Sequence, residues 1–228
     1  MQFYESHIMA IGALHPYQTG VKIRNTKKDD INKIVELQKE SFPLLANYGN
    51  IWREEELHSH LNVFPEGQYV AEEPDGTIVG SASTLIVSLN PEYADHSWKE
   101  ITANGMFTNH NPNGDSLYGA DISTHPKYRH EGIGSMLYDE RKQLVIKLKL
   151  RRMIAGGRLF NYSKYSSQIS AADYAKQVVE GKLHDPVLSF EIANGFRFIK
   201  ILSNYLEDVR SSNYASFIEW LNPNKDQF

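Results

Sequence analysis

Apolar residues recur along this chain with two periods. In some segments they recur every second residue, as in a strand, and in others every three or four residues, as in a helix. Alternation, or a run of β-branched residues, predicts seven strands, at residues 21–24, 68–73, 77–88, 118–124, 153–155, 196–206 and 214–221. Apolar residues three and four apart predict helices that begin near residues 30 and 133. The run Glu54-Glu55-Glu56 favours the first turn of a helix that begins near residue 52, and Pro186 is expected to open a short helix. The predicted order is therefore β-α-α-β-β-β-α-β-α-β-β, with a further helix in an insertion at about residues 158–185.

Capping and turn residues separate these elements. Asp29-Asp30 is expected to cap the first helix, which should end before Pro43. Pro74-Asp75-Gly76 predicts a tight hairpin between two strands. Gly156-Gly157 is expected to end the short strand at residues 153–155. Ser170 suits the N-cap of the insertion helix.

The elements together predict an α+β (mixed α/β) fold in which helices flank a central sheet of about seven strands. The 228 residues are most simply one domain at residues 20–228, behind an N-terminal extension at residues 1–19. A chain of this length buries about 70–75% of its unfolded surface, so it needs no disulfide or metal to hold it together. The polar stretch 89–117 is long for a connection within a domain, which is typical of a functional or flexible segment.

Composition excludes several kinds of chemistry. The chain has no cysteine, so it has no disulfide, no thiolate metal site and no cysteine nucleophile. Its net charge of −4 and the absence of a basic block argue against nucleic acid as a partner. Its apolar runs are too short to span a membrane, and residues 1–20 lack the basic start of a signal peptide, so a cytoplasmic location is expected. The nine histidines show no paired ligand spacing, and no metal is predicted.

The candidate chemistry lies in residues 118–145, where the strand at 118–124 leads through a polar turn and a glycine-bearing segment into an amphipathic helix. The first backbone N–H groups of a helix have no intrahelical partner and carry partial positive charge, so they bind anions. Gly132 and Gly134 remove the side chains that would keep a diphosphate from the backbone. The three-glycine spacing of a dinucleotide site and the Gly-x-Ser-x-Gly elbow of serine hydrolases are both missing.

Arg129, Gly132 and Gly134 form an R-x-x-G-x-G pattern, and His125-Pro126 precedes it. This segment, with its strand and helix, resembles the acetyl-CoA site of the GNAT superfamily of acyl-CoA N-acyltransferases. The resemblance covers roughly residues 20–221 and implies a GNAT-like fold, whose mixed, mostly antiparallel twisted sheet is splayed between its fourth and fifth strands.

The same resemblance implies how acetyl-CoA is held as a co-substrate. Main-chain atoms of the strand ahead of the turn pair with the pantetheine arm, at Ile122, Ser123 and Thr124. Backbone amides of the turn and first helical residues bind the diphosphate, at Arg129, His130, Glu131, Gly132, Ile133, Gly134 and Ser135. The Arg129 guanidinium either adds a charged contact to phosphate or is an exposed cation of the turn.

Three further stretches make the resemblance specific to one group within the superfamily: AGGRLFNYSKY (155–165), DPVLSFEIANGFRF (185–198) and NYLEDVRSSNYASFIEWLNP (204–223). They look like the acetyltransferase domain that some bacterial proteins carry ahead of a carbon–nitrogen hydrolase domain. No hydrolase segment stands in this sequence, so the resemblance implies a free-standing version, and a bacterial source is expected.

The general base is not settled by the sequence. An amine with a pKa near 10.4 must lose a proton before it attacks, and many relatives use a glutamate at the start of the central strand. That position here is Tyr118, which departs from the family pattern. Asp121 is the nearest carboxylate, but its odd spacing from Tyr118 directs it to the opposite face unless a bulge intervenes, and a structural hydrogen bond is its alternative role.

The proton donor for the leaving thiolate is equally open. Relatives use a tyrosine four residues before a Gly-Phe pair, and Glu191 stands there ahead of Gly195-Phe196. Glu191 would donate only if burial raised its pKa. Alternatives are a tyrosine of the insertion or no dedicated acid; the tyrosines are Tyr162, Tyr165 and Tyr174.

The sequence therefore predicts an acetyl-CoA-dependent N-acetyltransferase that transfers the acetyl group directly to a small-molecule or peptide amine. Alternatives are a non-catalytic CoA-binding or sensing module, and a transferase that uses a longer acyl group or a hydroxyl acceptor. In the loop at 109–115, His110 and Asp115 either bind the acceptor or simply build tight turns. A homodimer is possible, because relatives often pair through terminal strands.

Overall fold

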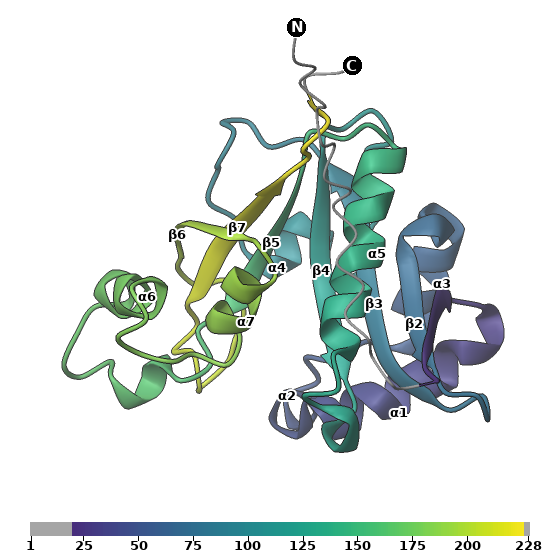
Figure 1. Ribbon diagram of the computed structural model, residues 1–228, viewed down its shortest axis with the longest axis horizontal. Helices are drawn as coiled ribbons and strands as arrows, with labels where there is room; N and C mark the ends of the chain where they lie inside the picture. The colour runs from purple at the N-terminus through teal and green to yellow at the C-terminus, as the bar shows by residue number, and fades with distance from the viewer. Residues whose placement is uncertain (1–19, 226–228) are drawn as a thin grey trace, which may run out of the picture.

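The computed structural model describes residues 20–225, which form one seven-stranded sheet in the order β1-β2-β3-β4-β5-β7-β6 (Figure 1). The strands are β1 (Lys22–Asn25), β2 (Gln68–Glu72), β3 (Ile78–Val87), β4 (Ser116–Thr124), β5 (Arg152–Arg158), β6 (Arg197–Leu202) and β7 (Ala215–Leu221). All neighbouring pairs are antiparallel except β4 and β5, which are parallel. The predicted α+β fold with a mixed, mostly antiparallel sheet is confirmed.

The α-helices of the described residues are α1 (Ile31–Ser41), α2 (Pro43–Asn47), α3 (Glu54–Val63), α4 (Trp98–Ile101), α5 (Ile133–Lys147), α6 (Ala171–Val179) and α7 (Leu188–Ala193). Two of them, α2 and α4, were not predicted. Pro43 was expected to mark only an end, but a proline also suits the first turn of a new helix. Ser97 and Glu100 cap α4 reciprocally, since the Ser97 Oγ accepts the Glu100 N–H at 3.2 Å and Glu100 accepts the Ser97 N–H at 2.7 Å.

Alternate residues of the central strands contribute to two apolar clusters, one on each face of the sheet. Leu117 and Met153 belong to the cluster that α5, α6 and α7 cover, whereas Tyr118 and Ile154 belong to the cluster of α1 and α3. The sheet is therefore a central layer between two helical layers. Consecutive residues of β4 and β5 consequently point into different apolar clusters, one on each face of the sheet.

The parallel pairing of β4 with β5 is short. It joins Ser116–Gly119 to Arg152–Ala155 and then stops, although both strands continue. Figure 1 shows the two strands together at one end and apart at the other, where the turn that leads into α5 lies. The predicted splay between the fourth and fifth strands is confirmed.

Two local predictions are wrong. Asp29-Asp30 does not cap α1: the Asp30 carboxylate instead accepts the Lys27 N–H at 2.7 Å and pairs with Arg24 at 2.7 Å. Gly156-Gly157 does not bound β5, which continues through both glycines to Arg158. The two glycines instead let other side chains approach the strand closely. A Cβ at Gly156 would lie 2.3 Å from the Tyr205 ring, and one at Gly157 would lie 2.0 Å from Glu191 Oε1.

Other local predictions are confirmed. Ser170 is the N-cap of α6, and its Oγ accepts the Asp173 N–H at 3.1 Å. β2 and β3 form the predicted hairpin across Pro74-Asp75-Gly76. The expected extension at residues 1–19 lies outside the described residues.

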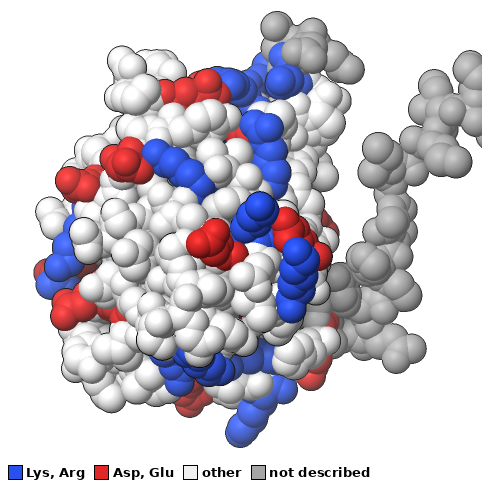
Figure 2. All heavy atoms as spheres, turned by 90° about the vertical axis from the view of Figure 1, so that its left-hand side faces the viewer, with Lys and Arg blue, Asp and Glu red and all other residues white. Residues whose placement is uncertain are grey.

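Charge and hydropathy of the described residues add little to the functional picture. Figure 2 shows basic and acidic side chains intermixed on the face that it presents. No helix between residues 20 and 225 combines the length and the hydropathy needed to cross a membrane. Over the same range, no three His, Asp or Glu side chains come together as metal ligands.

A buried ion network fixes the closed end of the split between β4 and β5. Arg152, on β5, is 1% exposed; it donates to Glu219 Oε1 at 2.9 Å and to Ser116 Oγ, on β4, at 2.8 Å. Arg197 donates to the second Glu219 oxygen at 2.6 Å. Burial alone would raise the pKa of Glu219, but the hydrogen bonds from these two arginines outweigh it and hold that pKa below its usual value.

We expect Arg152→Ala to lower the free energy of unfolding by about 3–5 kcal/mol, because it leaves the buried Glu219 with one partner fewer. The neighbouring Arg151→Ala is the control: Arg151 is 42% exposed, and its removal should change stability by less than about 1 kcal/mol. Urea denaturation of both variants measures the difference. Equal losses would contradict a structural role for the buried network.

Candidate active site

Within residues 20–225, several backbone N–H groups of the turn between β4 and α5 have no hydrogen-bond partner. Gly132 precedes the helix with a φ of 86°, a left-handed conformation that favours glycine. The first bond into the helix runs from the Met136 N–H to the Gly132 carbonyl at 3.0 Å. The N–H groups of Ile133, Gly134 and Ser135 therefore come before the intrahelical ladder and point from the positive end of a 15-residue helix. This arrangement fits a bound diphosphate.

Side chains of the turn take different roles from those of its backbone. Arg129 donates to the Ser41 carbonyl at 3.0 Å and so ties the turn to the end of α1. His130 has a φ of 67° and shares the left-handed turn with Gly132. Gly134 has a packing reason of its own, because a Cβ there would lie 2.8 Å from Phe190 Cζ. Glu131 is exposed.

The strand ahead of the turn has one free edge. Ile122, Ser123 and Thr124 pair with β3 on one side, but β5 no longer pairs with β4 at this level. Unpaired N–H and C=O groups at a strand edge can bind an extended ligand as if it were a further strand. The free edge and the unpaired amides of α5 adjoin, so one elongated ligand can contact both.

A bulge in β4 decides which way Asp121 points. Ser83 faces Asp121 and Thr84 faces Gly119, so Ala120 is an extra residue in the ladder. The bulge turns Asp121 to the face of Tyr118, as the sequence allowed only with a bulge. The Ala120 carbonyl accepts the indole N–H of Trp98, on α4, at 3.0 Å.

Asp121 is a partly buried carboxylate that accepts a hydrogen bond from a side chain of α1. Gln38, on α1, donates to Asp121 Oδ2 at 2.8 Å and to Ser123 Oγ at 3.1 Å. Burial raises the pKa of Asp121 to about 6, against the lowering effects of this hydrogen bond and of the nearby Arg141 charge. A carboxylate with such a pKa is ionised at neutral pH and binds a proton more readily than an ordinary aspartate.

Tyr118 joins a chain of hydrogen bonds. His96 Nδ1 lies 2.9 Å from the Ala94 carbonyl, which can only accept, so Nδ1 carries the proton of the neutral ring. His96 Nε2 therefore accepts from the Tyr118 hydroxyl at 3.0 Å, and the Tyr205 hydroxyl donates to Tyr118 at 2.9 Å. Burial lowers the pKa of His96, which favours the neutral ring, and raises that of Tyr118. The chain runs from Tyr205 to an imidazole that can accept a proton.

Glu191 lies on the other face of β5. Its carboxylate stands over Gly157 and accepts from Ser216 Oγ at 3.2 Å, whereas Tyr205 stands over Gly156. Consecutive strand residues face opposite ways, so β5 separates Glu191 from the Tyr118–Tyr205 pair. Burial raises the pKa of Glu191 well above its usual value, so the group holds its proton more tightly than an ordinary glutamate.

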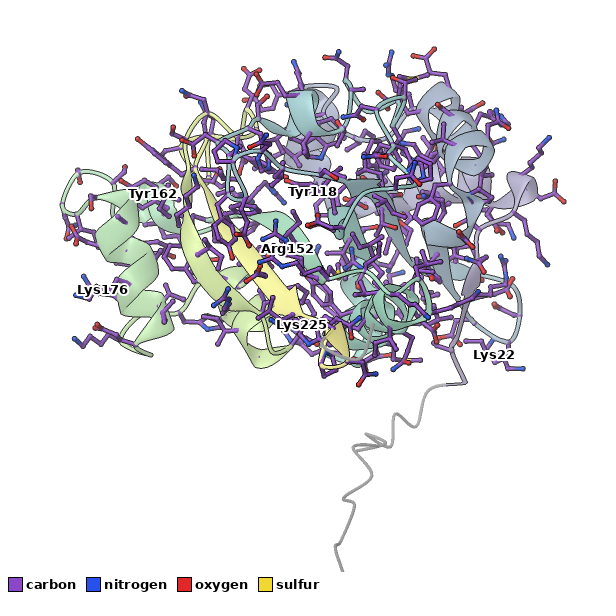
Figure 3. The ribbon with its side chains drawn as sticks, turned by 90° about the horizontal axis from the view of Figure 1, so that it is seen from above. Lys22, Tyr118, Arg152, Tyr162, Lys176 and Lys225 are labelled. Carbon is purple, nitrogen blue, oxygen red and sulfur yellow. The ribbon has the colours of Figure 1, made fainter. Side chains whose placement is uncertain are left out.

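The insertion tyrosines have structural partners. Tyr174 donates to Asp185 at 2.8 Å and Tyr162 donates to the Ile169 carbonyl at 3.2 Å, while Tyr165 packs against the Tyr174 ring. Figure 3 places Tyr162 on the side of α6, away from the central Tyr118. The tyrosine that reaches Tyr118 is instead Tyr205.

The loop at 109–115 also has structural bonds. His110 Nδ1 accepts the Ile86 N–H at 3.1 Å, and Asp115 accepts from Ser116 Oγ at 2.8 Å. These contacts agree with the tight-turn interpretation of the loop.

The sequence did not single out the residues that complete the site. Trp98, His96 and Tyr205 come from an unpredicted helix and from two irregular connections, and Gln38 comes from the buried face of α1. A further contact bridges the open end of the split, where the Arg158 guanidinium lies 5.4 Å from the Phe42 ring. The only signal available for any of them was the Ser97-x-x-Glu100 capping box, which predicts α4 but no function.

Comparison with known proteins agrees with this geometry. Residues 31–162 match the model of the Acetyltransferase (GNAT) family. Probable hydrolase YhcX of Bacillus subtilis (strain 168) is 45% identical over 208 residues, which are 90% of this chain and 39% of YhcX. The uncharacterized N-acetyltransferase YkwB of the same organism is 43% identical over 200 residues, 88% of each chain. The chain thus spans well under half of one relative and most of the other.

Solved structures confirm the fold. The loading GNATL domain of CurA from Lyngbya majuscula superposes with a TM-score of 0.76, over 89% of this chain and 98% of that domain. The two sequences are 20% identical, so this likeness concerns the fold alone. The predicted GNAT-like fold is confirmed.

We expect Asp121→Asn to stabilise the protein at pH 8 and to lose this effect as the pH falls. The pKa of Asp121 is about 6 in the folded state against a reference of 3.8, so the folded state binds the proton more tightly. The resulting stability is fully present below pH 3.8 and is lost as the pH rises through about 6. The asparagine variant avoids that loss, which is worth up to about 3 kcal/mol.

Urea denaturation between pH 4 and 8 measures the effect. Asp139→Asn is the control, because Asp139 is 65% exposed and its removal should give no such pH dependence. Destabilisation of the Asp121 variant at pH 8 would contradict the raised pKa.

Proposed function

The chain belongs to the Acetyltransferase (GNAT) family, and from this premise we propose that it transfers an acetyl group from acetyl-CoA directly to an amine. The acceptor we propose is a small molecule or a peptide. The single observation that carries the proposal is the row of unpaired amides at the start of α5 beside the free edge of β4. One elongated anionic ligand can occupy both.

In this proposal the backbone holds the coenzyme. The amides of Ile133, Gly134 and Ser135 receive the diphosphate, and the free edge of residues 122–124 receives the pantetheine arm. Arg129 acts mainly by fixing the turn against Ser41, because its guanidinium already donates there. Bound acetyl-CoA supplies an activated acetyl group as a thioester.

The residues around the split handle protons. We assign Asp121 as the base, because its carboxylate is ionised at neutral pH and its proton affinity is raised by burial. Tyr118 replaces the glutamate of many relatives, and its hydroxyl bonds to the neutral His96 ring offer a second route for the amine proton. We assign the proton for the leaving thiolate to one of two groups, Glu191 on one face of β5, whose pKa burial raises, or Tyr205 on the other.

One observation favours a second function. Tyr118 stands where many relatives carry a glutamate, and its hydroxyl is fully buried within a hydrogen-bonded chain. A protein that binds CoA without turnover would keep the coenzyme site and need no base. Release of free CoA in the presence of a broad panel of amines distinguishes the enzyme from such a module.

We expect Ser135→Pro to weaken CoA binding about tenfold or more, since it removes one amide that would bond to charged phosphate. Proline is tolerated in the first helical turn, where this N–H has no intrahelical partner. Ser135→Ala is the matched control, because it keeps the amide and should keep the affinity. Calorimetry with CoA measures both, and unchanged affinity in a folded proline variant would place the diphosphate elsewhere.

We expect kcat/KM to rise with pH through about 6 as Asp121 loses its proton. Asp121→Asn should lower kcat by about 10²-fold or more and remove this rise, which is the usual size of a general-base effect. Free CoA release measured between pH 5 and 9 tests this. Wild-type kcat in the asparagine variant, with loss of kcat in Tyr118→Phe, would transfer the role to the Tyr118–His96 chain.

A further inference from the structure

Arg141 is a buried cation at the point where β4 and β5 separate. It lies on α5 and is 1% exposed. Its Nη1 donates to the Asp121 carbonyl at 3.2 Å and would lie 3.1 Å from a Cβ at Gly119, the last β4 residue that pairs with β5. The absence of a side chain at Gly119 gives the guanidinium access to the split.

Two of its three nitrogens have no partner. Nε and Nη2 of Arg141 make no hydrogen bond within residues 20–225, and no carboxylate of that range lies within 4.0 Å. Arg152 is equally buried but bonds to Glu219, Ser116 and Glu92. Leaving a buried charge without a partner is costly, so an arginine of this kind normally meets an anion. The Tyr138 ring lies 4.5 Å from the guanidinium carbon, and this cation–π contact is weaker than the ion pair that an anion would provide.

The acidic groups that face Arg141 act on it only at a distance, and none within residues 20–225 forms an ion pair with it. Burial raises the pKa of Glu191, on α7, well above its usual value, which disfavours its charged form. Asp121, on β4, directs its carboxylate to Gln38 on the opposite face. The phenol groups of Tyr138 and Tyr69 are the other titratable groups that act on it, and both are neutral at physiological pH. The positive charge is therefore available to a ligand.

The position of Arg141 indicates which part of a ligand it meets. It stands eight residues beyond Ile133, about 12 Å along the helix axis from the proposed diphosphate site and on the same face of the sheet. The proposed proton acceptors for the amine, Asp121 and His96, lie on the other face, with α1 and α4. Arg141 therefore faces the acyl end of the donor rather than the amine.

We propose that Arg141 binds a carboxylate on the acyl group of a second class of donor, so that the site takes, besides acetyl-CoA, a CoA thioester of a short dicarboxylic acid and binds it more tightly. A guanidinium presents paired N–H donors whose geometry matches a carboxylate. This inference rests on the proposed CoA site but goes beyond it, because it names the class of acyl group.

Calorimetry of the wild-type protein tests the inference without turnover. The probes are CoA, acetyl-CoA, malonyl-CoA and succinyl-CoA, with acetoacetyl-CoA as the uncharged match for malonyl-CoA. We expect one of the two carboxylated thioesters to bind about tenfold more tightly or better than the uncharged ones, as a charge-assisted bond provides. Equal affinities would overturn the inference and leave the proposed function intact. Failure of CoA itself to bind would overturn both.

Arg141→Met tests the assignment to this residue. We expect the variant to lose the preference for a carboxylate and to keep its affinity for acetyl-CoA within about threefold. Lys142→Met is the matched control, since it removes the neighbouring cation, whose Nζ bonds to the Asn194 carbonyl, and should keep the preference. A preference that survives in Arg141→Met would overturn the assignment. If that variant does not fold, the wild-type ranking still decides the proposal.

The amine could carry a carboxylate instead. With acetyl-CoA present, glutamate and glutamine are compared as ligands of the wild type and of Arg141→Met. A preference for glutamate that depends on Arg141, together with equal binding of all the thioesters, would place the carboxylate on the acceptor and overturn the proposal.

Discussion

The candidate site depends on one feature of the sheet: the hydrogen-bonded pairing between β4 and β5 stops after Gly119. Beyond Gly119 the two strands diverge, and the inner edge of β4 loses its strand partner. Within β5, Gly156 and Gly157 have no side chain, so Tyr205 and Glu191 can approach the strand from opposite faces. A site with a backbone edge, two proton-bearing groups and a buried arginine follows from this one break in pairing.

Contacts at both ends of the split support its shape. At the closed end, Arg152 joins Ser116 of β4 to Glu219 of β7. At the open end, Arg158 lies over the Phe42 ring and pairs with Asp208 at 3.3 Å. These contacts lie at opposite ends of the split, so the gap between the strands is maintained by packing and charge rather than by pairing. A preorganised gap lowers the entropic cost of ordering an extended ligand.

Local signals were sufficient for most of the fold. The strands, the glycine turn and the helices α1, α3, α5, α6 and α7 follow from periodicity, caps and turns within a few residues. The side-chain network was not predictable in the same way. The carbonyl of the bulged Ala120 bonds to Trp98, 22 residues away, and the Tyr118–Tyr205 contact spans 87 residues. Gly156-Gly157 was expected to end a strand, because glycines that allow a close tertiary contact look the same in a sequence as glycines of a turn.

In the proposed site the coenzyme's diphosphate rests on the backbone amides that begin α5. A crystal structure of the complex with acetyl-CoA tests it most directly. We expect phosphate oxygens within hydrogen-bond distance of the amides of Ile133, Gly134 and Ser135, with the pantetheine arm along residues 122–124. Electron density for the coenzyme on another surface, with this turn empty, would contradict it.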